Sequence, residues 1–134
     1  MGITQGSIDD KFRPLIRVAL ADVGEDFLAL LDTGFNGSLL CSRYGAAALR
    51  VELSGLSEKV QLAGGIEQQV ERGWLDITWL GQRRRVRVLV SAAETVRRTI
   101  GDDEPAALVG GALLAPSLVL LDYGAMTLEI EAQG

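Results

Sequence analysis

The tripeptide Asp32-Thr33-Gly34 contains the residue types in this sequence that best fit a chemical role. It directly follows a continuous apolar run over residues 27–31, which predicts a buried strand that ends at the carboxylate. Gly34 allows the backbone to turn tightly beneath that carboxylate. Such a setting limits water, and desolvation or a like-charged neighbour moves the pKa of a carboxyl group as acid/base catalysis requires. The alternative is an Asx-type turn that closes a hairpin, because Asp and Gly are favoured turn residues.

Two later segments add to this motif. Residues 61–66 have the sequence Gln-Leu-Ala-Gly-Gly-Ile, which places two glycines between alternating strands and predicts a hairpin turn. Residues 107–110 are Ala-Leu-Val-Gly and lead into a short helix opened at Gly111, which Pro116 ends. The apolar and turn residues over 119–130 then predict a closing hairpin.

Taken in this order, the three segments resemble the retropepsin-like (clan AA) aspartic proteases, in particular small single-domain prokaryotic members with one Asp-Thr-Gly per chain. The similarity spans roughly residues 14 to 131. It implies a mainly β, closed, antiparallel barrel-like acid-protease fold with one or two short helices. The whole chain, residues 1–134, would then be one domain, with residues 1–13 as an N-terminal arm.

The resemblance also implies roles for particular residues. Asp32 would be the catalytic carboxylate, Thr33 would brace a pair of such carboxylates, and Gly34 would shape their loop. The substrate-binding residues would be Phe35, Asn36, Ala63, Gly64, Gly65, Ile66 and Val109, four of them at a flap tip.

The sequence departs from the family pattern beside the motif. The family usually has a small residue and then an Asp after Asp-Thr-Gly, whereas this chain has Phe35 and Asn36. A polar residue usually follows the later glycine, and here Gly111 takes its place. These differences bear on substrate specificity, and the sequence leaves open whether the Phe35 ring lines a pocket or packs in the core.

Composition excludes several other kinds of catalysis. The chain has 134 residues, 48% of them apolar, which fits one globular domain. It has no histidine and a single cysteine, which removes Ser-His-Asp and Cys-His catalysis and the common zinc sites. We therefore expect neither a cofactor nor a metal, and we interpret Cys41 as a small core residue.

Net charge and hydropathy limit the kinds of binding partner and the cellular location that we expect. A formal net charge of −5 argues against general nucleic-acid binding. Arg83, Arg84, Arg85 and Arg87 are a local exception that continues into alternating valines, which predicts a strand with a basic solvent face. A peptide- or phosphate-docking patch is the alternative. No apolar run is long enough to cross a membrane and the polar N-terminus has no signal-peptide pattern, so we predict a cytoplasmic protein.

Several boundaries follow from local signals. The apolar patterns predict strands over residues 15–21, 58–63, 66–78 and 83–90. Ser42 is positioned to cap a short helix that ends at Leu49. Ser54-Gly55 predicts a turn, and residues 91–105 predict a polar surface connection.

One Asp-Thr-Gly per chain has a consequence for stoichiometry. Aspartic proteolysis needs two carboxylates that share one proton, so the second would come from another copy across a two-fold axis. The other acids considered, Asp22, Asp26, Asp76, Asp102, Asp103 and Asp122, fall in turns or on strand faces where solvent reaches them. The sequence therefore predicts a homodimeric aspartic endopeptidase acting on peptides or proteins. The alternative is a dimeric module of the same fold that binds peptides without cutting them.

Overall fold

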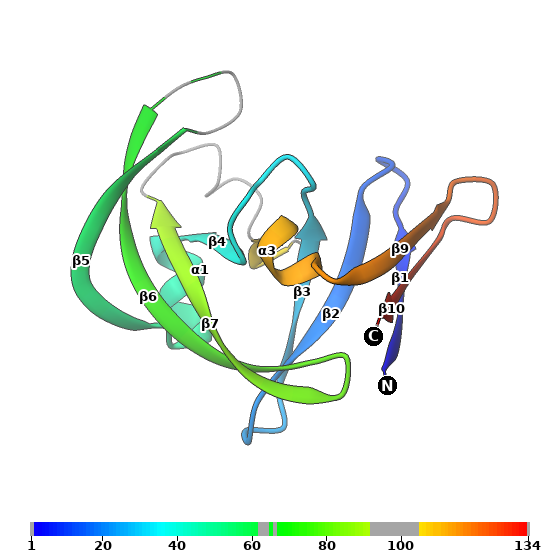
Figure 1. The fold of residues 1–134 in the computed structure, drawn as a ribbon, viewed down its shortest axis with the longest axis horizontal. Helices are drawn as coiled ribbons and strands as arrows, with labels where there is room; N and C mark the ends of the chain where they lie inside the picture. The colour runs from blue at the N-terminus through cyan, green and yellow to red at the C-terminus, as the bar shows by residue number, and fades with distance from the viewer. Residues whose placement is uncertain (1, 62–64, 66, 92–104, 134) are drawn as a thin grey trace.

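The computed structural model describes residues 2–61, 65, 67–91 and 105–133, and this part of the chain is mainly β with two short helices (Figure 1). The strands are β1 (Ile3–Ile8), β2 (Pro14–Leu20), β3 (Asp26–Leu31), β4 (Leu39–Ser42), β5 (Glu52–Gln61), β6 (Glu67–Trp79), β7 (Gln82–Ser91), β8 (Ala107–Val109), β9 (Ser117–Asp122) and β10 (Thr127–Ala132). The helices are α1 (Arg43–Leu49) and α3 (Gly111–Leu114).

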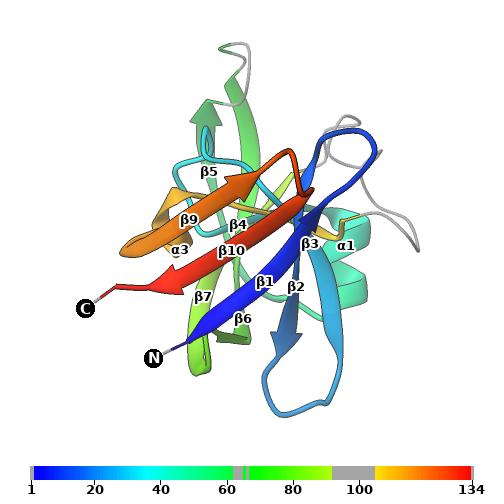
Figure 2. The ribbon, with the colours of Figure 1, turned by 90° about the vertical axis from the view of Figure 1, so that its right-hand side faces the viewer.

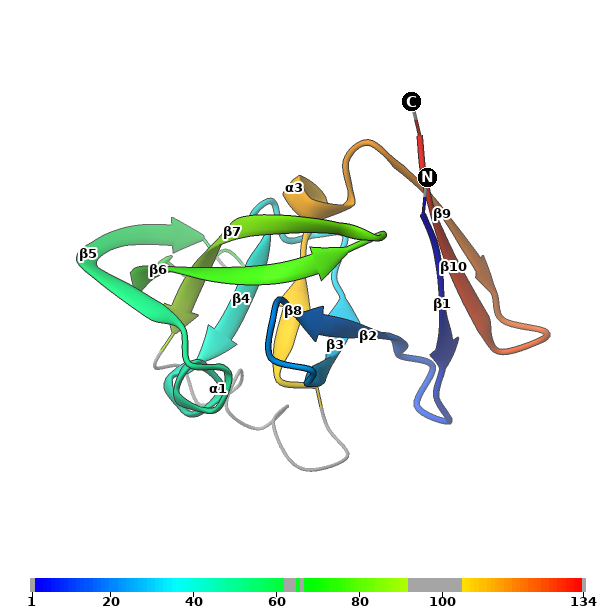
Figure 3. The ribbon, with the colours of Figure 1, turned by 90° about the horizontal axis from the view of Figure 1, so that it is seen from below.

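The centre of the molecule is a closed barrel. Its strands follow the order β6-β7-β4-β8-β3-β2, and a further pairing of β2 with β6 closes the ring (Figure 3). The mainly β, closed fold predicted from the sequence is confirmed. Most ladders are antiparallel as predicted, but β3 pairs with β8 and β4 with β7 in parallel. The two parallel ladders bring the end of β3 beside the end of β8.

The barrel interior is filled by alternating apolar side chains. Ile16, Leu39, Ile77 and Leu113 have at most 1% of their surface exposed, and burial of this kind is the main driving force for folding. Cys41 belongs to the same core, where desolvation raises the pKa of its thiol to about 12. The interpretation of Cys41 as a core residue is therefore confirmed.

Two extensions leave the barrel on opposite sides. The β5–β6 hairpin rises from one side, and a sheet of β1, β10 and β9 lies on the other (Figures 1 and 2). β1 pairs with both β2 and β10, so residues 1–13, expected as an arm, include a strand that is integral to this sheet. Among the described strands β9 pairs with β10 alone, and it forms the outer edge of this sheet.

Some local predictions hold and one does not. The Ser42 hydroxyl accepts a hydrogen bond from the Gly45 N–H at 3.1 Å and caps α1 as expected. The turn predicted at Ser54-Gly55 is wrong, because β5 continues through it with a register shift against β6 between Leu53 and Ser57. Gly55 has a φ of +80°, which fits a bulge that needs a left-handed residue.

Residues 92–104 contain most of the predicted polar connection and lie outside the described part. Among the described residues, no helix is both long enough and apolar enough to cross a membrane.

Candidate active site

Asp32 lies where β3 ends beside β8. Leu31 is paired with Val109, and the Asp32 N–H donates to the Val109 carbonyl at 2.9 Å. The Gly34 N–H donates to Oδ1 of Asp32 at 3.0 Å, and the Phe35 N–H donates to the Asp32 carbonyl at 3.1 Å. The side chain is half-buried. The backbone therefore fixes one carboxylate oxygen from below and leaves the remaining acceptor positions open to water.

The loop that follows Asp32 is interlocked with the segment that enters α3. The Gly110 N–H donates to the Ser38 carbonyl at 3.0 Å, and the Gly111 N–H donates to the Phe35 carbonyl at 2.7 Å. The Ala112 N–H donates to the Gly37 carbonyl at 3.2 Å. These bonds satisfy N–H groups at the start of α3, which have no partner inside a helix. They also make the position of the Asp32 loop depend on α3.

Gly110 is required by this close approach. A Cβ at residue 110 would collide with the Gly37 carbonyl oxygen and would come within 2.6 Å of the Phe35 carbonyl oxygen and 2.5 Å of the Phe35 ring. Because two of these neighbours are backbone, no side-chain rotation relieves the collision. The glycine that the sequence places after Val109 therefore has a steric cause.

The Phe35 ring lies close to both Gly37 and Gly110, where the Asp32 loop meets the segment that enters α3. The three atoms nearest to a Cβ at Gly37 would all belong to this ring, at 2.5 to 3.3 Å. Phe35 is half-buried and packs against a small apolar cluster that is separate from the barrel core. This cluster contains Leu40, Val60, Val70, Leu89 and Leu108. Phe35 is thus both a packing residue and a partly exposed neighbour of the Asp32 loop.

We call this group of residues the Phe35 cluster, and the sequence analysis did not predict it. Its residues come from β4, β7 and β8 of the barrel, from β5 and β6 of the hairpin, and from the Asp32 loop. The cluster therefore packs the hairpin against that loop. The alternation of side chains along β5 and β6 places Val60 and Val70 on the same face of the hairpin. This alternation is the sequence signal from which part of the cluster could have been predicted. What the sequence did not reveal was which barrel residues lie opposite them.

The other predicted site residues fall into three groups. Thr33, Gly34 and Asn36 are exposed beside Asp32, and the Thr33 side chain makes no hydrogen bond within the described part of the chain. Val109 is fully buried, so it serves the site through its carbonyl.

Of the expected flap tip, Ala63, Gly64 and Ile66 lie outside the described residues. Gly65 has a φ of +76°, which suits a hairpin turn.

Four of the competing acids are engaged elsewhere on the surface, and Asp102 and Asp103 lie outside the described residues. Asp26 pairs with Arg17 at 2.9 Å, and Asp122 accepts from the Ala125 N–H at 3.0 Å. Asp22 and Asp76 both pair with Arg83. Asp32, in contrast, has no ion pair with any described residue. An uncompensated carboxylate held by backbone at a strand end is chemically available to bind and polarise water.

The overall fold is similar to that of solved structures. A retropepsin-like aspartic protease from Rickettsia conorii superposes with a TM-score of 0.65 and 18% sequence identity, over 96% of this chain and 89% of that one. EIAV protease in complex with the inhibitor HBY-793 superposes with a TM-score of 0.54 and 20% identity, over 79% of this chain and 88% of that one. No protein-family model and no curated protein matches the sequence. At these identities the likeness establishes the fold, and the chain has the retropepsin-like aspartic protease fold.

The contact between Gly37 and the Phe35 ring leads to a prediction about stability. Gly37→Ala should destabilise the protein by about 1–3 kcal/mol, the usual cost of overpacking. In a Phe35→Ala background the same change should cost under ~0.5 kcal/mol, because the three atoms nearest to the added Cβ belong to the Phe35 ring and are removed. Denaturant unfolding of the four proteins of this cycle measures the coupling.

Gly110→Ala is the matched control for this cycle. Its Cβ also meets backbone oxygens, so its cost should persist in the Phe35→Ala background. An equal cost of Gly37→Ala in both backgrounds would contradict the described packing.

Proposed function

We propose that this chain is one half of an aspartic endopeptidase, which acts as a homodimer on peptides or proteins. The observation that carries the proposal is the uncompensated Asp32 carboxylate, oriented by the Gly34 N–H where β3 ends beside β8. The likeness to two solved aspartic proteases supports it.

The reaction requires two carboxylates that share one proton. The ionised one removes a proton from water, and the protonated one donates to the carbonyl oxygen of the scissile peptide bond. The described chain offers a single Asp32 in this setting, so the second comes from another copy across a two-fold axis. The unpaired hydroxyl of Thr33 is free to hydrogen-bond across that axis and hold the two loops in register.

The free edge of β9 is the surface best suited to form the dimer. It presents four consecutive apolar residues, Leu118 to Leu121, of which Leu118 and Leu120 are 44% and 51% exposed. Soluble proteins usually protect such an edge with charges or cover it. β9 follows α3 after two residues, and α3 is bonded to the Asp32 loop. Pairing of two β9 strands would therefore set the two loops relative to each other.

The substrate-binding side is formed by the β5–β6 hairpin and the Phe35 cluster. We propose that an extended peptide lies between the hairpin and the Asp32 loop, with Phe35, Asn36 and the hairpin tip around it. The half-buried Phe35 ring occupies space beside the carboxylate, which favours a small substrate side chain there. The same ring supports the second candidate function, a peptide-binding module without turnover.

The proposed chemistry predicts a specific result for Asp32→Asn. Wild type should cut a peptide library with a bell-shaped pH profile, because activity is lost when both carboxylates are protonated and again when both are ionised. Asp32→Asn should lose cleavage at every pH while keeping its thermal unfolding temperature within a few degrees, as measured by mass spectrometry and circular dichroism. Cleavage by both proteins would assign the chemistry to another acid. Binding without cleavage by wild type would favour the non-catalytic module.

The edge of β9 gives a second prediction. Leu120→Lys should convert the dimer to monomer at micromolar concentration, because a charge at the paired edge opposes strand addition. Leu120 lies opposite Glu129 on β10, so the lysine has a partner in the monomer and the fold should persist. Light scattering and peptide cleavage on the same samples measure both effects. Val23→Lys, at an exposed turn residue on β2–β3, is the matched control and should remain dimeric and active. A dimeric Leu120→Lys variant would exclude this edge as the interface.

A further inference from the structure

Arg84 lies on the other face of β7 from the neighbouring Arg83 and Arg85, which form ion pairs. Arg83 pairs with Asp22 and Asp76, and Arg85 pairs with Glu52 at 2.8 Å, all on the outer face of the barrel. These pairs and the approach of Arg87 to the Trp74 ring at 5.9 Å fit the predicted basic solvent face.

Arg84 has the opposite orientation. It shares its side of β7 with the buried Val86 and Val88 and stands opposite the fully buried Ile77. It makes no ion pair or hydrogen bond with any described residue. Arg84 is nevertheless exposed, so its guanidinium extends beyond the apolar core into space that solvent reaches, where no described carboxylate pairs with it.

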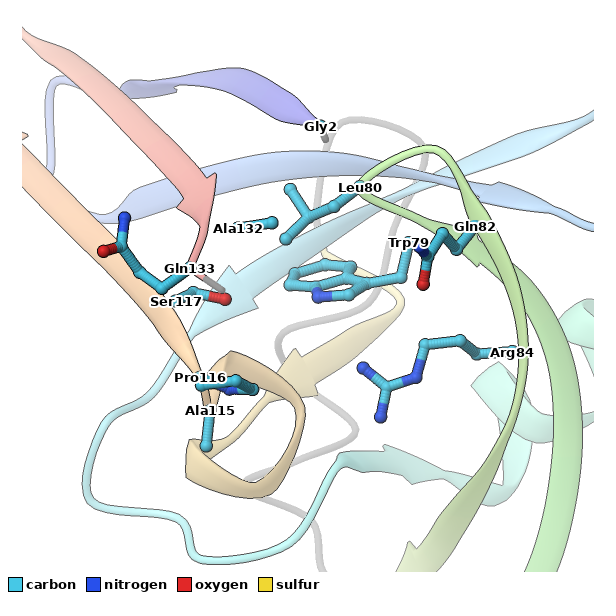
Figure 4. Close-up of a pocket in the computed structure, with 10 residues that line it drawn as sticks. All are labelled: Gly2, Trp79, Leu80, Gln82, Arg84, Ala115, Pro116, Ser117, Ala132 and Gln133. Atoms are coloured by element: carbon cyan, nitrogen blue, oxygen red, sulfur yellow. The ribbon is translucent and has the colours of Figure 1, made fainter.

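A cavity of about 260 Å³ opens in front of this guanidinium (Figure 4). It lies where the β6–β7 turn, the connection from α3 to β9, and both described chain ends meet. Its lining residues are Gly2, Trp79, Leu80, Gln82, Arg84, Ala115, Pro116, Ser117, Ala132 and Gln133. We call this space the Arg84 cavity.

The walls of the Arg84 cavity are held by backbone contacts. The Ala132 N–H donates to the Gly2 carbonyl at 3.1 Å, and the Gln133 N–H donates to the Pro116 carbonyl at 3.1 Å. Gly2 lies so close to the Leu80 backbone that a Cβ there would collide with the Leu80 carbonyl. The cavity is therefore built from fixed elements that are distant in sequence.

Several polar groups border the Arg84 cavity. In Figure 4 the Arg84 guanidinium points into the space between the Trp79 ring and Pro116. The Trp79 side chain is 5% exposed and makes no hydrogen bond with a described residue, yet no buried side-chain nitrogen in the described part lacks a partner. Its indole N–H is therefore open to the cavity. The Ser117 hydroxyl and the Gln82 amide complete a set of donors.

We propose that the Arg84 cavity binds an organic monocarboxylate with an apolar body. A guanidinium presents two parallel N–H donors that match a carboxylate, and Trp79 and Ser117 can donate further bonds. One cation in a chain of net charge −5 suits a single negative charge better than a polyanion. Trp79, Leu80 and Pro116 supply apolar surface for the rest of the ligand. The carboxylate can belong to a free small acid or to the C-terminus of a peptide.

This site does not depend on the proposed proteolysis, because no residue of the Asp32 loop lines the cavity. It can therefore be tested in the Asp32→Asn variant, in which cleavage of a peptide probe is not a complication.

Tryptophan fluorescence provides a direct test. The chain has two tryptophans, so Trp74→Phe leaves Trp79 in the cavity wall as the single reporter. In the Asp32→Asn, Trp74→Phe protein, N-acetyl-leucine should change the Trp79 emission saturably, and N-acetyl-leucinamide should not. Adding Arg84→Gln should weaken binding by about tenfold or more, since a charged hydrogen-bond partner is lost. Arg87→Gln, on the opposite face of the same strand, should bind as before.

The arms of the titration separate the possible ligands. A leucine-ended pentapeptide that binds more tightly than N-acetyl-leucine would identify the peptide C-terminus as the source, and the reverse order would identify a free acid. Equal binding of acid and amide would overturn the proposal, and that comparison holds even if Arg84→Gln does not fold. Unchanged binding by a folded Arg84→Gln, or tighter binding of inorganic phosphate than of N-acetyl-leucine, would also overturn it.

Discussion

The backbone crossing between the Asp32 loop and the Val109–Ala112 segment is the constraint on which the rest of the structure depends. Four backbone hydrogen bonds join the two segments, and there is no room for a side chain at Gly110. The parallel pairing of β3 with β8 brings them together, and β4 returns antiparallel on the other side of β8. Because buried backbone groups must be satisfied, loosening this crossing would cost both stability and the orientation of Asp32.

The same crossing links the carboxylate to the edge of the molecule. α3 begins on the bonded glycines and leads directly into β9, whose apolar edge has no partner among the described strands. The proposed half-site, with its one carboxylate, and the apolar edge of β9 are therefore connected through α3. A two-fold dimer would complete both with one interface, whereas a monomer would leave both incomplete.

Much of this arrangement was readable from local sequence signals. The apolar run that ends at Asp32, the cap at Ser42 and the later apolar-Gly segment each have a local physical cause, and the structure has the expected strands and helices there. Gly55 was misassigned because a left-handed glycine is compatible with a turn or with a bulge, and the pairing across β6 decides between them. The place of the exposed Arg84 at the edge of a cavity was not predicted either. Alternation placed it on the side of Val86, but only the three-dimensional meeting of β7 with the chain ends creates the cavity in front of it.

The proposed dimer requires that each active site contain one Asp32 from each of two chains. The test is to mix wild type with increasing Asp32→Asn at a fixed total chain concentration, allow the chains to exchange, and measure the initial rate of peptide cleavage. Mixed dimers hold one carboxylate and should be inactive, so the rate should fall as the square of the wild-type fraction. A rate that falls in simple proportion to the wild-type fraction would mean that one chain carries a complete site, and would contradict the account.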